Sequence, residues 1–151
     1  MGKKIMKLDR TGAVQNPIFL GVEHIGLYPT RDITADEIAE WYAENLGMNK
    51  VEGKVSFFLS SSTNPGRIEV LKEPFEDVKC HIAVQVSNFE EACRILKDKG
   101  IELQEPRKIY LSISKEGTKI VYLKKTDPIG NRIHLIYRPQ SHFLSLARAS
   151  I

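Results

Sequence analysis

Hydrophobic and polar positions alternate in short stretches along the chain, and two patterns typical of amphipathic helices lie between them. The first alternating stretch, 21–28, predicts a strand, and the segment between Thr34 and Gly47 predicts a helix. Thr34 with Glu37 three residues later is a capping box, and glycine is a common helix stop. The apolar residues expected on one face of this helix are Ile38, Trp41, Tyr42 and Leu46. Extended runs are then expected at about 48–52, 54–60 and 67–72.

The second half of the chain repeats this order. The alternating stretch 80–86 predicts a strand, and a helix is expected to begin after Asn88 and to end at Gly100. The apolar stripe of this second helix consists of Phe89, Ala92, Cys93 and Leu96. Extended runs follow near 101–104, at 109–113 with 118–124, and at 132–138. Each half therefore has the order β-α-β-β-β, which predicts an α+β fold of two duplicated modules.

The limits of the repeat set the expected domain boundaries. One domain is predicted over residues 18–139, with modules at 18–74 and 78–139. Residues 1–17 and 140–151 lack strand alternation and helix caps, so we expect an N-terminal extension and a C-terminal tail. The tail contains an apolar run at 143–147, which would be unfavourable in water. We expect this run to pack on a partner or on the domain itself.

Strand alternation separates apolar side chains from a set of imidazoles and one carboxylate. The side chains predicted to pack inward are Ile25, Leu27, Ile68, Val70, Cys80, Ile82, Val84, Val86, Ile133, Leu135 and Tyr137. On the opposite faces lie His24 and Glu69 in the first module, and His81 and His134 in the second. Each pair comes from the first and last strand of its module, with similar separation in the sequence. A pseudo-twofold axis between the modules would bring all four side chains to one centre.

The chemistry of these four groups points to a divalent transition metal. Neutral imidazoles with one carboxylate suit Zn, Ni, Co, Fe or Mn, and they are poor ligands for Ca or Mg. The alternative is that each histidine is a hydrogen-bonded residue of the cleft wall. The fourth histidine, His142, falls in the tail.

Composition and charge restrict the classes of partner. The net charge is +3 with interspersed charges and no concentrated basic stripe, which argues against a nucleic-acid partner. No apolar run approaches the roughly 18 residues of a membrane span, so no membrane partner is expected. The start of the chain has no apolar core of a secretory signal, and a cytoplasmic location is expected. Cys80 and Cys93 are expected to be free thiols.

Two motifs resemble a known superfamily. The sequence W-Y-A-E-N-L-G-M at 41–48 resembles the helix end of vicinal oxygen chelate proteins. The sequence D-P-I-G-N-R-I-H-L at 127–135 is similar to their D-P-x-G-N-x-x-E-L turn and last strand. This superfamily, which is of the glyoxalase, bleomycin-resistance and extradiol-dioxygenase type, includes glyoxalase I, methylmalonyl-CoA epimerase and fosfomycin-resistance proteins. The resemblance covers about residues 18–139.

The resemblance implies a curved mixed sheet around a metal cleft, and often a homodimer. It implies one divalent metal held by His24, Glu69, His81 and the residue at position 134. The superfamily usually has Glu at the last position, where this chain has His134. A histidine can still bind the metal or carry a proton, but it adds no negative charge.

The function expected first is that of a glyoxalase I-like, metal-dependent isomerase or lyase, which moves a proton next to a carbonyl of a small oxygenated substrate. Glu69 is the expected base, and His134 is the alternative proton carrier. The residues expected to contact the substrate are Tyr28, Gln85, Arg132 and Arg138.

Two other functions stay open at this point. Two histidines and one carboxylate around Fe(II) would suit an extradiol-type dioxygenase, although a fourth ligand would fill a position that oxygen chemistry needs. A non-catalytic small-molecule binding or resistance protein would use the same cleft without turnover. Such proteins usually lose the ligand set that this chain retains.

Overall fold

The computed structural model describes residues 17–63, 66–109 and 117–139. The first module consists of β1 (Phe19–Leu27), α1 (Ala35–Leu46), β2 (Asn49–Glu52), β3 (Ser56–Ser60) and β4 (Arg67–Leu71). The second consists of β5 (Cys80–Val86), α2 (Phe89–Asp98), β6 (Arg107–Ile109), β7 (Thr118–Tyr122) and β8 (Arg132–Tyr137). The repeated β-α-β-β-β order is confirmed. The run expected at 101–104 is wrong as a strand, because it forms only an isolated bridge between Leu103 and Leu123.

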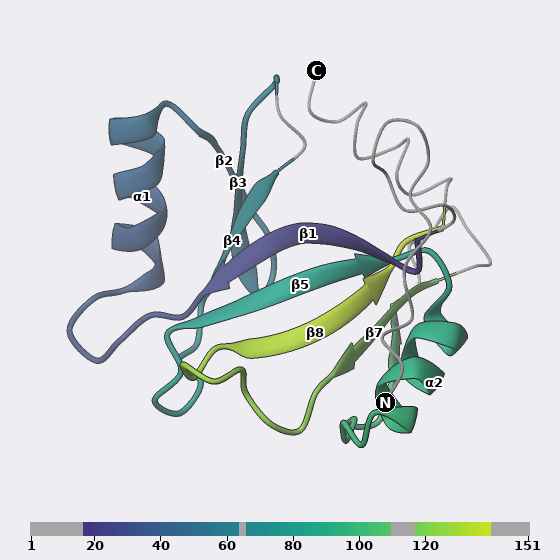
Figure 1. Ribbon diagram of the computed structural model, residues 1–151. Helices are drawn as coiled ribbons and strands as arrows, with labels where there is room; N and C mark the ends of the chain where they lie inside the picture. The colour runs from purple at the N-terminus through teal and green to yellow at the C-terminus, as the bar shows by residue number, and fades with distance from the viewer. Residues whose placement is uncertain (1–16, 64–65, 110–116, 140–151) are drawn as a thin grey trace.

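All eight strands belong to one curved, open sheet with the order β2-β3-β4-β1-β5-β8-β7-β6 (Figure 1). Within the modules, β1 pairs parallel with β4, and β5 pairs parallel with β8. The modules are joined by antiparallel pairing of β1 with β5. The first and last strands of both modules therefore lie together in the middle of the sheet.

The two helices pack on one half of the sheet each. The side chain of Thr34 accepts a hydrogen bond from the backbone of Glu37, and Gly47 ends α1 with a left-handed backbone, both as the sequence predicts. The core of the first module is formed by Ala35, Ala39, Phe57, Leu59 and Val70. The core of the second is formed by Val86, Phe89, Ala92, Val121 and Leu135. Neither of these helices is long and apolar enough to cross a membrane.

Some residues that were expected to pack inward are exposed. Trp41 and Leu46 of α1 are 55% and 59% exposed, because Ala35 and Ala39 form the buried contact and bring the helix close to the sheet. Ile25 of β1 is 40% exposed. The helix α1 packs on β2, β3 and β4, whereas α2 packs on β8. In the order of the sheet, β1 therefore lies between the strands that the two helices cover.

Two features of the central strand β1 shape the surroundings of the histidines. Its register against β5 shifts between Val22, which is opposite Val84, and His24, which is opposite Ala83. One extra residue, Glu23, is therefore accommodated as a β-bulge. Further along, Gly26 lies opposite His81, and a Cβ atom at position 26 would overlap the imidazole ring of His81. The absence of a side chain at Gly26 thus makes room for a buried imidazole.

We expect Gly26→Ala to destabilise the fold by about 1–3 kcal/mol, the usual cost of overpacking a buried site. The free energy of unfolding, measured by urea denaturation, checks this. His81→Ala removes the ring that the added methyl group would meet, so the double variant should be more stable than the sum of the single effects predicts. Strictly additive costs would show that the two positions do not compete for space.

Candidate metal centre

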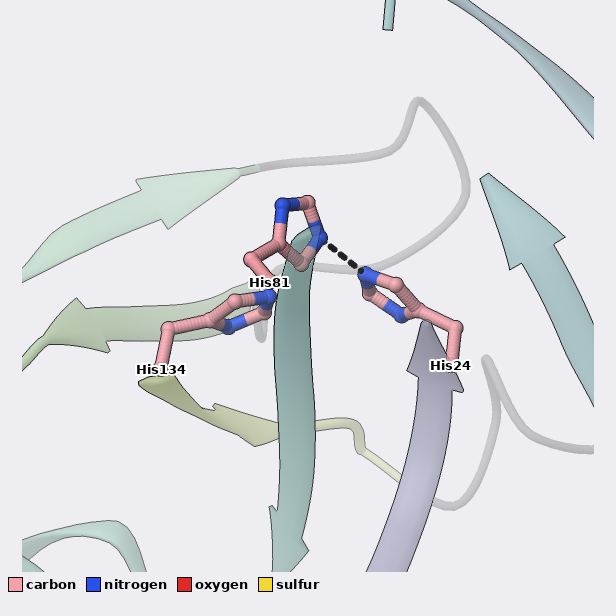
Figure 2. A group of neighbouring side chains, drawn as sticks. All are labelled: His24, His81 and His134. Carbon is pink, nitrogen blue, oxygen red and sulfur yellow. Dashed lines mark hydrogen bonds between the residues drawn. The ribbon is translucent and has the colours of Figure 1, made fainter. Parts of the chain in front are cut away.

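Three imidazoles converge from three neighbouring strands in the middle of the sheet. His24 comes from β1, His81 from β5 and His134 from β8, and Figure 2 shows their rings grouped together. One ring nitrogen from each lies within 4.8 Å of the others. His24 Nε2 and His81 Nε2 are 3.1 Å apart. The side chains are 5%, 1% and 2% exposed, so the expected convergence of the histidines is confirmed at a buried point.

Glu69 of β4 adds a carboxylate to this group. Its Oε2 atom is 3.2 Å from His24 Nε2 and 3.4 Å from His81 Nε2. Its other oxygen, Oε1, accepts a hydrogen bond of 2.9 Å from the hydroxyl of Ser56. Ser56 therefore holds one oxygen and leaves the other facing the imidazoles.

The strand register explains why the four groups meet. In the first module His24 is paired with Arg67, and in the second His81 is paired with Arg132. Two residues beyond each arginine comes the second donor, in the sequences Arg-Ile-Glu at 67–69 and Arg-Ile-His at 132–134. Glu69 and His134 thus occupy equivalent places in two copies of one arrangement.

The second nitrogen of each ring has a partner away from the centre. His24 Nδ1 contacts the carboxylate of Glu23. His81 Nδ1 forms a hydrogen bond of 2.9 Å with the hydroxyl of Tyr28, and His134 Nδ1 lies 3.3 Å from the carbonyl oxygen of Leu135. A proton held on Nδ1 leaves the Nε2 lone pair available to a metal. Three such imidazoles and a carboxylate are a donor set that fits Zn, Fe, Co, Ni or Mn.

The pKa values show how this centre treats charge. Burial would raise the pKa of Glu69, but hydrogen bonds with His24 and His81 hold it well below its usual range. Burial would lower the pKa of His24, but hydrogen bonds with Glu23 and Glu69 raise it. Burial and the charges of the other two imidazoles lower the pKa of His134 to about 3. The centre therefore favours an ionised Glu69 carboxylate beside a protonated His24, and a neutral His134.

A cationic and aromatic group lies beside His81. The Arg132 guanidinium stacks between the rings of Phe75 and Tyr122, at 3.7 and 4.0 Å from their centroids. Its Nη1 atom donates a hydrogen bond of 2.9 Å to the hydroxyl of Tyr28. Two residues expected to contact a substrate, Tyr28 and Arg132, are therefore in contact with each other and next to the centre.

The other two residues expected to contact a substrate lie further away. Arg138 Nε donates to Glu23 Oε1 at 3.1 Å, and so belongs to the surroundings of His24. Gln85 lies four residues beyond His81 on β5, opposite Gly21 of β1. A role of either residue in substrate binding stays a prediction. His142 lies outside the described residues.

Two charged residues that support His24 are not among the site residues predicted from the sequence. Strand alternation places Arg67 on the same face of β4 as Glu69, and its Nη2 atom donates to Glu23 Oε1 at 2.5 Å. The Arg-Ile repeat at 67–68 and 132–133 is the sequence feature that could have pointed to Arg67 as a residue of the site. Glu23 was missed because strand alternation places it opposite to His24, and only the bulge brings the two side chains together.

Burial would raise the pKa of Glu23, but its hydrogen bond with His24 and the charges of Arg138 and Arg67 lower it to about 2. Its carboxyl group is thus ionised at neutral pH. A negative charge lies directly behind the imidazole of His24.

Comparison with known proteins supports the fold. No protein-family model and no curated protein sequence matches this chain. Among solved structures, methylmalonyl-CoA epimerase from Mycobacterium tuberculosis is similar with a TM-score of 0.63 and 19% identity, covering 86% of this chain and 96% of that one. A Streptomyces coelicolor methylmalonyl-CoA epimerase in complex with 2-nitronate-propionyl-CoA has a TM-score of 0.58 at 19% identity, with 79% and 97% covered.

A hypothetical protein from Bacillus halodurans is similar as well, with a TM-score of 0.57 and 21% identity over 78% of this chain and 94% of that one. At such identities the likeness concerns the arrangement of the backbone. Methylmalonyl-CoA epimerase is a member of the vicinal oxygen chelate superfamily. The chain therefore has the vicinal oxygen chelate fold, as the motifs at 41–48 and 127–135 predict.

Proposed function

We propose that this protein is a divalent-metal-dependent isomerase of the glyoxalase-like type, which moves a proton next to the carbonyl of a small oxygenated substrate. The observation that carries the proposal is the buried set of three imidazoles and one carboxylate. The similarity to methylmalonyl-CoA epimerases, which are isomerases, supports the class of reaction. His24, Glu69, His81 and His134 would hold the metal.

A bound divalent metal supplies Lewis-acid stabilisation of negative charge that develops on a carbonyl oxygen. The chain itself must supply the base. Glu69 suits this role because Ser56 holds its Oε1 atom, while its Oε2 atom faces the centre. Its lowered pKa keeps the carboxyl group ionised at neutral pH, which is the form that can accept a proton from the substrate carbon.

His134 is the weaker candidate for proton transfer. The low pKa of its imidazole, about 3, keeps the ring neutral near neutral pH, so it carries a single proton. A ring that binds a metal through Nε2 and donates from Nδ1 to the Leu135 carbonyl has no free position for catalysis. We therefore assign His134 to the metal and Glu69 to proton transfer as well as to the metal.

An acyl thioester is the first substrate class to test, because a similar structure contains methylmalonyl-CoA. Arg132 would bind an anionic group of the substrate, and Tyr28 and Gln85 would orient it. The four donors argue against an extradiol-type dioxygenase, since dioxygen and a catechol need several open positions on the metal. A homodimer and a cytoplasmic location remain predictions.

The first prediction from this proposal concerns metal content. Protein purified without affinity tag or chelator should contain close to one transition-metal ion per chain by mass spectrometry. His81→Ala and Glu69→Gln should each lower this content sharply, because each removes a ligand. Cys80→Ala is the matched control on the same strand and should retain the metal, as should His142→Ala. Equal retention in the ligand variants and the controls would contradict the assignment of the ligands.

The second prediction concerns the reaction. In D₂O, the metal-loaded protein should exchange the proton next to the carbonyl of methylmalonyl-CoA or of another member of a panel of acyl thioesters and 2-oxo compounds. Proton NMR of the substrate measures this exchange. Glu69→Gln should lower the rate per bound metal by about 10²–10⁴-fold, the usual contribution of a general base. A metal-bearing wild type that binds these compounds without any exchange would instead indicate a binding protein.

A further inference from the structure

Glu23 is a buried carboxylate that the proposed chemistry does not use. Its side chain is 9% exposed, although it follows an exposed residue of the central strand. On a regular strand, neighbours point to opposite faces, so Glu23 would lie away from His24. The register shift between Val22 and His24 removes this alternation and leaves Glu23 beside the imidazole. The fold thus departs from a regular strand at the residue that contacts a proposed ligand.

The two oxygens of Glu23 face different partners. Oε1 accepts hydrogen bonds from Arg67 Nη2 at 2.5 Å and from Arg138 Nε at 3.1 Å. Oε2 contacts His24 Nδ1. Two guanidinium groups from β4 and from the residue after β8 therefore hold the carboxylate against rotation. Because the two guanidinium groups fix Oε1, the other oxygen, Oε2, points toward the imidazole ring of His24.

An ionised carboxylate can only accept hydrogen bonds, so His24 Nδ1 must carry a proton. We propose that Glu23, clamped by Arg67 and Arg138, is a positioning residue that keeps the proton of His24 on Nδ1 and directs the Nε2 atom at the metal centre. This inference rests on the proposed metal site. The second nitrogen of a ligating histidine commonly has such a partner, and losing that partner usually lowers metal affinity by about 10–100-fold.

The equivalent position behind His81 is different. Its Nδ1 atom meets the hydroxyl of Tyr28, which can either donate or accept. A hydroxyl does not impose a tautomer, whereas a carboxylate does. Of these two imidazoles, His24 is therefore the one whose proton is fixed by charge.

Glu23→Gln tests this difference with almost no change in shape. The amide of Gln has one acceptor oxygen, and Arg67 and Arg138 both require an acceptor. The oxygen would stay with the arginines, and the amide NH₂ would then face His24 Nδ1. That nitrogen would have to accept, which moves the ring proton to Nε2 and blocks the atom that should bind the metal.

The experiment uses full-length protein, zinc as the probe and two readouts. Zinc affinity is measured by competition with a chromophoric chelator, and the Nδ1–H proton of His24 is observed by NMR with ¹⁵N-labelled histidine. Glu23→Gln should lower zinc affinity by about 10–100-fold and abolish the Nδ1–H resonance. Glu91→Gln on α2 is the matched control, because it makes the same substitution in a carboxylate that is paired with an arginine, Arg94, but does not contact the imidazoles. Its zinc affinity should stay within about threefold of wild type, well below the loss expected when the partner of the imidazole is removed.

The outcomes separate the two proposals. A wild type that binds no zinc overturns the metal site, whereas the Nδ1–H resonance still tests the contact with Glu23. A wild type that binds zinc, with Glu23→Gln binding equally well, overturns only the positioning role. Equal losses in Glu23→Gln and Glu91→Gln would show that the loss does not depend on the contact with His24, and would also overturn the positioning role. If Glu23→Gln does not fold, the absence of a His24 Nδ1–H resonance in wild type would by itself overturn the inference.

Discussion

The antiparallel pairing of β1 with β5 is the contact on which the rest of the structure depends. It joins two modules that each have one helix and one small core, and it makes a single sheet of them. The same pairing brings His24 and His81 within hydrogen-bonding distance. The parallel partners of these two strands then contribute Glu69 and His134. Neither module has more than two of the four donors, so the centre exists only where the modules meet.

A buried polar centre is stable only if its groups are paired, because an unpaired buried donor or acceptor costs about 1–3 kcal/mol. Here the rear nitrogens of the rings contact Glu23, Tyr28 and the Leu135 carbonyl. The charged groups behind them are paired in turn, Glu23 with two arginines and Arg132 with two aromatic rings. The surroundings thus fix the rings before any ligand binds, which lowers the cost of ordering them.

Much of the fold, and the four side chains that meet at the centre, could be predicted from local sequence. The caps of both helices and the alternation in β4, β5 and β8 are properties of short segments, and the structure agrees with them. The exposed Ile25 and Trp41 could not be predicted, because their burial depends on where the helices lie over the sheet. The contact of Glu23 with His24 depends on a shift of register against another strand, and no pattern within β1 reveals it.

The two copies differ in one donor, and this difference makes the two sides of the centre unlike. The modules present Arg-Ile-Glu and Arg-Ile-His at equivalent places, so the approximate twofold symmetry of the backbone is broken by charge. A planar intermediate held at the centre would have an anionic oxygen on one side and a neutral ring on the other. Its two faces would therefore be chemically distinct, although the strands around it are nearly symmetric. A single side chain thus distinguishes the two sides of a duplicated strand arrangement.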